Sequence, residues 1–213
     1  MADLDFFFDP VCPWAWITSR WVREVQQLRD YEVEWRFISL RFLNESSMDY
    51  SKMPEGYKEI HHAGTMGLRV AAHARAERGN DAVSALYTAL GTSLHNREER
   101  ASMVADPVAH LGEVLRRADL PDEWARVSQS EDHDALIRTE TELALSRTGK
   151  DVGTPILTFR PGSDGEASFF GPVISNIPRG DEALRLWDAV ETIATSSGMA
   201  ELKRSLRARP SFD

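Results

Sequence analysis

Residues 8–19 read FDPVCPWAWITS and decide the fold, because they join a strand pattern to a helix pattern through one short turn. The run that leads into them, LDFFF at residues 4–8, is typical of a buried strand and closes at Asp9-Pro10. Beyond Pro13, apolar residues recur at spacings of four, four and three, which predicts a helix with one face toward a core. Those residues are Ile17, Trp21, Val25 and Leu28.

Cys12 lies at the turn of this strand-turn-helix unit and is the only cysteine in the chain. A cysteine at the first turn of a helix faces unpaired backbone NH groups and the positive end of the helix dipole, and both favour the thiolate. We therefore expect its pKa to fall from about 8.5 to roughly 3.5 to 7.5, with the sulfur at the mouth of the fold. Composition alone favours another interpretation, a buried cysteine that acts as a small hydrophobic residue.

A second segment, Val152-Gly153-Thr154-Pro155, precedes a predicted third strand. In thioredoxin-like folds a cis proline at this place packs against the active thiol, and X-Pro is the bond for which the cis form costs least. We expect Pro155 to be this cis proline. The alternative is an ordinary proline at the entry to a strand.

The remaining pattern places strands at both ends of the chain and helices in the middle. Residues 32–40 predict a second strand, residues 54–150 are wholly helical in pattern, and residues 155–172 predict a hairpin that a last helix follows. This order is that of an α/β thioredoxin-like fold with an inserted all-helical domain. We expect residues 1–53 and 151–213 to form the thioredoxin-like domain and residues 54–150 the inserted domain.

Composition narrows the class of function. The 213 residues can bury a core without disulfides, and 34 acidic against 25 basic residues give a net charge of -9. The basic residues form no stripe, which argues against nucleic acid and anionic membrane as partners. The first ten residues lack the basic and apolar regions of a secretory signal, and no apolar run has transmembrane length, so we expect a cytoplasmic protein.

Metal and nucleotide cofactors are not expected. The six histidines contain no i, i+4 pair, and a single cysteine disfavours a structural zinc site. The chain also lacks a Gly-rich phosphate loop, a dinucleotide fingerprint and the Gly-x-Ser-x-Gly elbow of serine hydrolases.

The sequence resembles a known family, the cytosolic DsbA-like thioredoxin-fold proteins of mycothiol-using bacteria, in its mycothiol-dependent nitroreductase branch. The resemblance runs nearly end to end, and several of its stretches are specific to the branch. They are FDPVCPWAWITSRW (8–21), SLRFLNE (39–45), PEGYKE (54–59), ALYTALGTSLHN (85–96), DVGTPILTF (151–159), FFGPVISNIPRGDEALRLWDA (169–189), and ELKR with PSFD near the end.

This resemblance implies roles for matching positions and mycothiol as a co-substrate. Cys12 would be the nucleophile, and Pro13 and Trp14 the site dipeptide, with Trp14 stacking on an aromatic substrate. Thr154, after Gly153 and before the cis Pro155, would offer backbone groups to a bound thiol or peptide. The resemblance also implies three residues that look onto a cleft between the domains, each of which could instead cap or pack: Asn44, Tyr57 and His95.

Ala15 departs from the family pattern, in which the tetrad is Cys-Pro-Trp-Cys and the second cysteine resolves the mixed disulfide formed by the first. Three interpretations are open. Ala15 is an engineered replacement of cysteine, or it is natural in a protein that uses mycothiol through Cys12 alone, or Cys12 is vestigial in a protein that only binds ligand.

The leading hypothesis is a mycothiol-dependent thiol-disulfide oxidoreductase that reduces disulfides or nitroaromatic-type electrophiles through Cys12. The first alternative is a thiol-dependent isomerase or transferase resembling kappa-class glutathione transferases, which activate a cofactor thiol without a dithiol of their own. A non-catalytic module that binds thiols or aromatic ligands is the second alternative. The expected partners are mycothiol and small aromatic or disulfide substrates, and the sequence leaves room for a homodimer.

Overall fold

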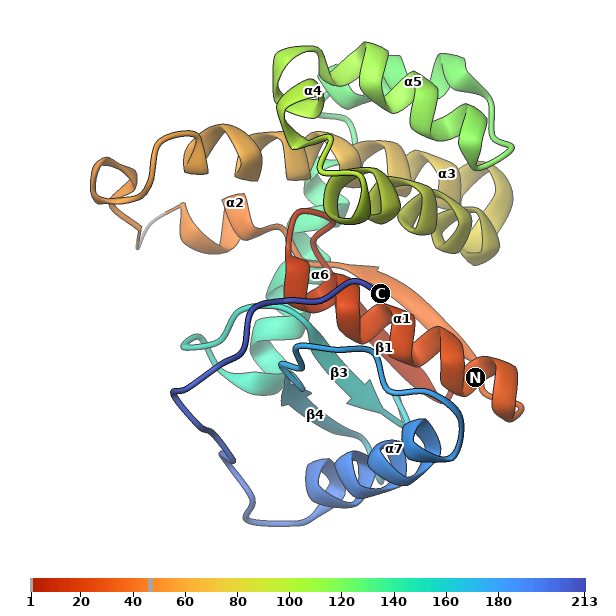
Figure 1. Ribbon diagram of the computed structural model, residues 1–213, viewed down its shortest axis with the longest axis vertical. Helices are drawn as coiled ribbons and strands as arrows, with labels where there is room; N and C mark the ends of the chain where they lie inside the picture. The colour runs from red at the N-terminus through yellow and green to blue at the C-terminus, as the bar shows by residue number, and fades with distance from the viewer. Residues whose placement is uncertain (1, 46–47) are drawn as a thin grey trace.

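A computed structural model describes residues 2–45 and 48–213. Its centre is a four-stranded mixed sheet in the order β2-β1-β3-β4 (Figure 1). The strand β1 (Leu4–Phe8) pairs parallel with β2 (Val33–Phe37) and antiparallel with β3 (Ile156–Phe159), which pairs antiparallel with β4 (Ala167–Phe170). The predicted strands and the predicted hairpin are therefore present.

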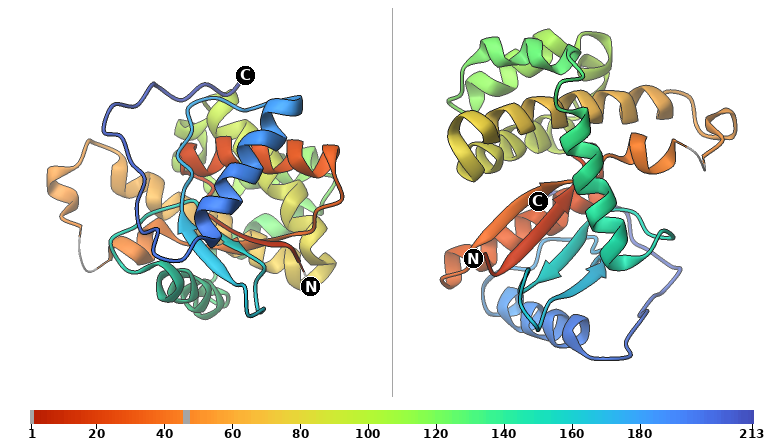
Figure 2. Two further views of the ribbon diagram at one scale, coloured as in Figure 1. Left: turned by 90° about the horizontal axis from the view of Figure 1, so that it is seen from below. Right: turned by 180° about the vertical axis from the view of Figure 1, so that it is seen from behind.

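Helices cover both faces of this sheet, which explains why every residue of β1 is buried. On one face, α1 (Pro13–Leu28) packs beside α7 (Gly180–Thr195), and the rings of Trp21 and Trp187 meet edge to face at 5.0 Å. On the other face lies α6 (Asp134–Thr148), which crosses in front of the sheet in the right-hand view of Figure 2. Cys12, which precedes α1, is therefore attached to a sheet that helices cover on both faces.

Polar contacts attach α6 to the sheet. Glu140, only 4% exposed, accepts a hydrogen bond from the Phe37 amide of the edge strand β2 at 2.8 Å. Arg147 forms an ion pair with Asp5 of β1 at 2.8 Å. The sequence analysis assigned this helix to the inserted domain. In the structure it packs against the sheet. The proposed division of the chain at residues 54 and 150 stays a prediction.

The segment between β2 and α6 is mostly helical in its described residues. The helical pattern predicted for residues 54–150 is confirmed, while the two short helices before it, α2 and η1, were not predicted. Its long helix α3 is broken at Gly79, whose φ of 77° is a conformation that favours glycine. No helix in the described residues has the length and apolar character needed to cross a membrane. The elements of this segment are α2 (Leu40–Asn44), η1 (Tyr50–Lys52), α3 (Tyr57–Gly91), η2 (Thr92–Asn96), α4 (Arg100–Ala105), α5 (Pro107–Arg117) and η3 (Asp122–Gln129).

Two expectations fail at the ends of elements. The second strand does not reach Leu40, because the Ser39 hydroxyl accepts the Phe42 amide at 3.3 Å and caps a helix that begins at Leu40. Leu28, expected on the core face, is 43% exposed. It is the last residue of α1, and the chain turns there into the extended conformation of Arg29.

The helices α1 and α3 approach each other closely where Trp16 meets Gly91. A Cβ atom at Gly91 would overlap the Trp16 ring, so only glycine fits here. Trp16 also lies edge-on to Tyr87 at 5.7 Å, and Tyr87 stacks on Phe8 of β1 at 3.8 Å. Aromatic packing therefore makes one continuous core of the sheet and the helical segment.

Candidate functional site

Cys12 is the N-cap residue of α1, between the end of β1 and the first helical turn. Its Sγ atom accepts a hydrogen bond from the Ala15 amide at 3.5 Å and donates one to the Thr154 carbonyl oxygen at 3.3 Å. The residue is only 6% exposed. The predicted position at the helix start is confirmed, but the sulfur is buried beneath the surface instead of standing open at the mouth of the fold.

This burial reverses the expected acidity of the thiol. Loss of solvent raises the pKa of Cys12 to about 12, and the negative charge of Asp9 acts in the same direction. The amides of Ala15 and Trp14 and the charge of Arg100 lower the pKa, but by less. The expectation of a thiolate was wrong because the helix start lies in a dry environment. In this state Cys12 is a neutral thiol that donates to Thr154.

The third strand begins beside this thiol. The peptide bond between Thr154 and Pro155 is cis, which confirms the prediction from the sequence. The Thr154 hydroxyl donates to the Phe7 carbonyl at 3.2 Å, so the segment is fixed to the end of β1 while its own carbonyl faces Cys12. Pro155 is buried, and Gly153 is half-buried next to it.

Asp9 is a candidate residue that the sequence reasoning missed. Its fully buried carboxylate accepts hydrogen bonds from the amides of Leu40 at 2.8 Å and Val11 at 3.1 Å. A Cβ atom at Gly64 would lie 2.7 Å from its Oδ1, so glycine in α3 permits the approach. Burial raises the pKa of Asp9 to about 7 despite both amides. The available signal was an acid three residues before the only cysteine, in an otherwise apolar stretch.

Tyr57 lies at the start of α3, within the electrostatic reach of Cys12. Burial raises its pKa, and the negative charge that Cys12 carries when ionised acts in the same direction. Its ring packs at 4.3 Å from that of His61, whose Nδ1 lies 3.1 Å from the Tyr50 hydroxyl. The resemblance implied Tyr57. Tyr50 and His61 were missed because only the turn before α3 brings them into contact.

His95 is buried behind the turn that carries Cys12. Its Nε2 lies 2.8 Å from the Pro10 carbonyl, and its Nδ1 accepts from Arg100 at 2.9 Å. Nε2 therefore carries the proton, and burial lowers the pKa of His95 to about 4. With both nitrogens engaged, His95 holds the turn in place. Arg100, which the sequence did not single out, is part of this contact.

Comparison with known proteins now places the chain. A family model described as "Mycothiol-dependent nitroreductase Rv2466c" matches residues 11–204. The chain belongs to this family. It is also 30% identical, over 204 residues, to the uncharacterized protein Rv2286c of Mycobacterium tuberculosis, a match that covers 96% of this chain and 82% of that protein.

Solved structures support the fold of this Rv2466c-like chain. A "putative protein disulfide isomerase" from Nitrosomonas europaea matches with a TM-score of 0.52 and 15% identity, covering 87% of this chain and 95% of its own. The cytosolic disulfide reductase DsbM from Pseudomonas aeruginosa matches with a TM-score of 0.50 and 14% identity, covering 78% and 88%. At these identities the matches show the fold, a DsbA-like thioredoxin fold with a helical insertion.

The other residues that the family resemblance implied differ in their position relative to Cys12. Pro13 opens α1, and Trp14 is half-buried against the core. Ala15 is fully buried in the first turn of α1 and has no group that could attack a disulfide. Asn44 ends α2 and donates to the Leu40 carbonyl at 2.8 Å, so its amide serves its own helix in this structure.

The described residues hold no group of three histidine, cysteine or acidic side chains arranged to bind a metal ion. Around Cys12 the structure brings together one sulfur, the backbone groups of Ala15 and Thr154, and the buried carboxyl of Asp9, three residues earlier in the chain.

Proposed function

We propose that this chain is a mycothiol-dependent oxidoreductase, with Cys12 as nucleophile and disulfides or nitroaromatic-type compounds as substrates. The observation that carries the proposal is the placement of the Cys12 sulfur at the N-cap of α1, against Thr154 and the cis Pro155, in a member of the Rv2466c family. Mycothiol fits the chemistry of the site, because the chain has one thiol and needs an external second one.

The first step requires the Cys12 thiol to lose its proton. The amides of Ala15 and Trp14 then stabilise the negative sulfur, as the lowering effect of both on its pKa indicates. The thiolate attacks one sulfur of a substrate disulfide. A new S–S bond forms at Cys12, the substrate S–S bond breaks, and the other sulfur leaves with the electron pair and takes up a proton.

Ala15 decides how the cycle ends. Because no second thiol is present, the mixed disulfide on Cys12 persists until an external thiol attacks it and frees the Cys12 sulfur. Mycothiol supplies this thiol: its sulfur bonds to the substrate sulfur, and the Cys12 thiolate leaves. Because Cys12 is regenerated, both electrons of each turnover come from two mycothiol molecules, the second of which releases the remaining substrate thiol and leaves mycothiol disulfide. With a nitro compound the same two electrons and two protons, again from two mycothiol molecules that end as their disulfide, give a nitroso compound and water. Half-buried Trp14 and Tyr57 provide the flat surfaces that an aromatic substrate requires.

One observation favours a second function. Cys12 rests as a neutral thiol that donates a hydrogen bond, and a donor of this kind can stabilise the thiolate of a bound co-substrate instead of attacking it. The protein would then be a thiol-dependent isomerase or transferase in which the co-substrate supplies the reactive sulfur. Serine at position 12 would preserve that donor.

The test compares the natural chain with Cys12→Ser and with Ala15→Cys. Incubation with oxidised mycothiol should give one adduct by intact-mass measurement, and Cys12→Ser should show no adduct and no reduction of disulfide or nitro compounds. Ala15→Cys should shorten the lifetime of the adduct, because a resolving thiol is then present. Turnover that persists in Cys12→Ser, without any adduct, would instead establish the transferase. Saturable binding with neither adduct nor turnover would contradict both functions.

A further inference from the structure

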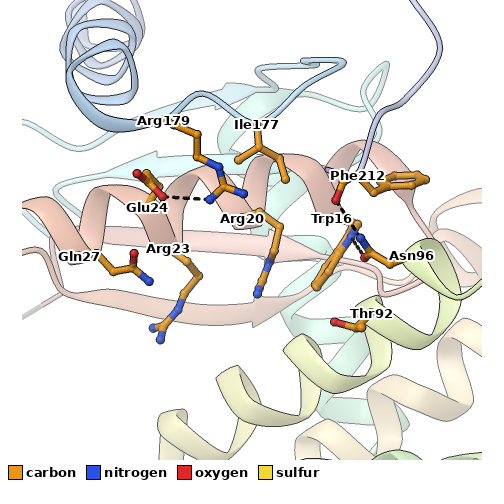
Figure 3. A pocket seen from close by; sticks show the side chains of 10 residues that line it. All are labelled: Trp16, Arg20, Arg23, Glu24, Gln27, Thr92, Asn96, Ile177, Arg179 and Phe212. Atoms are coloured by element: carbon orange, nitrogen blue, oxygen red, sulfur yellow. Dashed lines mark hydrogen bonds and ion pairs between the residues drawn. The ribbon is translucent and has the colours of Figure 1, made fainter.

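A cavity lies away from the Cys12 sulfur, along α1. It has a volume of about 310 Å³, and its walls come from α1, η2, the loop before α7 and the last residues of the chain (Figure 3). This volume equals that of about ten water molecules, which suits a small molecule. Cys12 is not among the lining residues, which are Trp16, Arg20, Arg23, Glu24, Gln27, Thr92, Asn96, Ile177, Arg179 and Phe212.

Positive charge is in excess in this cavity. Glu24 is its one acidic residue, and it is paired with Arg179 at 3.0 Å and with the Gly180 amide at 3.0 Å. Arg20 and Arg23 extend from α1 to the side opposite Arg179 (Figure 3). In residues 2–45 and 48–213, neither of these two arginines has a carboxylate within ion-pair distance. Two cations thus stand unbalanced in a chain whose net charge is -9.

Arg20 makes two hydrogen bonds and leaves one nitrogen of its guanidinium unused. Its Nη1 donates to the Thr88 hydroxyl at 3.1 Å, its Nε donates to the Ser19 hydroxyl at 3.2 Å, and its guanidinium lies 4.1 Å from the centre of the Trp16 ring. Its Nη2 is buried and has no hydrogen-bond partner in the described residues. A buried charged donor without an acceptor is costly, so an acceptor that a ligand brings would stabilise a shift of this guanidinium that opens Nη2 to the cavity.

Arg23 stands one turn further along α1 and is less constrained. Its one side-chain hydrogen bond in the described residues is to Gln26 at 3.0 Å. It also borders a larger hollow of about 660 Å³ that shares Thr92 with the first. Arg23 can therefore turn toward an anion that Arg20 already contacts. On the opposite side, Ile177 and Phe212 give the cavity an apolar wall.

We propose that this cavity is a binding site for a small molecule that carries an oxyanion, a carboxylate or phosphate, next to an apolar group. The Arg20 guanidinium shifts so that its Nη2 reaches the oxyanion, and Arg23 completes the contact, while the apolar group lies against Ile177 and Phe212. Guanidinium groups match the geometry of both anions. Burial lowers the pKa of Arg20 to about 10, which leaves it cationic at neutral pH. The site is independent of the thiol chemistry proposed for Cys12.

The test measures binding of inorganic phosphate and of benzoate at low ionic strength, where screening is weak. The reporter is the indole NH signal of Trp16, which donates to Asn96 in the cavity at 3.0 Å and is identified by its absence in Trp16→Phe. We expect a saturable shift with at least one probe. Phosphate alone, benzoate alone or both would each support an oxyanion site and define its chemistry, and no saturable shift with either would overturn it.

Three variants give the specificity. Arg20→Gln and Arg23→Gln should each weaken binding on the order of tenfold, as expected for loss of a charged hydrogen bond. The matched control is Arg185→Gln, which removes an exposed arginine of α7 outside the cavity and should leave binding unchanged. If Arg20→Gln unfolds, Arg23→Gln decides, because among the described residues Arg23 forms a side-chain hydrogen bond with Gln26 alone. Equal weakening by Arg185→Gln would show a general charge effect and overturn the site. Binding that persists in Cys12→Ser separates this site from the proposed thiol function.

Discussion

The Cys12 sulfur donates its hydrogen bond to the carbonyl oxygen of Thr154, the residue just before the cis proline. The two residues are 142 positions apart, and both belong to segments that the sequence singles out. A thiolate could not make this contact with a carbonyl oxygen, so the geometry and the raised pKa describe the same neutral state.

Cys12 should therefore react slowly with alkylating agents at neutral pH. With a pKa raised to about 12, its thiolate fraction rises about tenfold for each pH unit from pH 7 to 10. The rate constant for iodoacetamide, measured by intact mass between pH 6 and 10, should rise over this whole range without a plateau. Free cysteine, whose rate levels off above its own pKa, is the control. A plateau below pH 8 would contradict the buried neutral thiol.

Asp9 should make the protein less stable as the pH rises. Its folded-state pKa is raised to about 7 from an ordinary 3.8, so the folded state binds the proton more tightly, and this contribution is lost between about pH 4 and 7. Asp9→Asn should remove this pH dependence. Urea unfolding of both proteins at pH 5 and 7.5 measures the difference, and the same pH dependence in the two would show that Asp9 does not titrate in this range.

His95 should have the opposite effect over an overlapping range. Its pKa is lowered to about 4, so the stability that comes from the neutral ring is complete above about pH 6.5 and is lost as the pH falls toward 4. In His95→Gln this acid-sensitive part should vanish. Because Asp9 and His95 oppose each other, only the difference between each variant and the natural protein, measured by urea unfolding from pH 4 to 7, isolates either one.

Gly64 should not tolerate a methyl group. Alanine there would place its Cβ 2.7 Å from Asp9 Oδ1 and 3.1 Å from the Val11 side chain, so we expect Gly64→Ala to destabilise the fold by about 1 to 3 kcal/mol. Gly112→Ala is the matched control, since Gly112 lies within α5 and a Cβ atom there would be 3.8 Å from its nearest neighbours, Ala125 and Asp122 of η3. It should stabilise the protein by about 0.5 to 1 kcal/mol. Thermal and urea unfolding compare the two, and equal effects would argue against a steric cause.

The sequence was informative where local pattern determines structure. The strand before Cys12, the helix after it and the cis Pro155 follow from short-range spacing and from the two segments that the family resemblance joins. The pKa of Cys12 could not be predicted in this way, because it depends on how completely other segments exclude water. Asp9 was missed for the same reason, since its importance comes from the Leu40 amide and the close approach of Gly64.

The contacts of the residues around the site could not be predicted from local sequence patterns either. Arg100 and His61 lie in segments that the sequence correctly described as helical, but their contacts with His95 and Tyr50 depend on turns whose geometry no local pattern specified. The roles proposed for Trp14, Tyr57 and Asn44 stay predictions.

The contact between Trp16 and Gly91 also has an evolutionary consequence. These two positions lie 75 residues apart, in the first helix after the sheet begins and at the end of the long helix, yet they share one volume. Any relative that carries a larger residue where this chain has Gly91 must carry a smaller one where it has Trp16, or displace one helix. The two positions should therefore covary in an alignment of the family. The combined size of their two side chains should indicate the distance between α1 and α3 in each member.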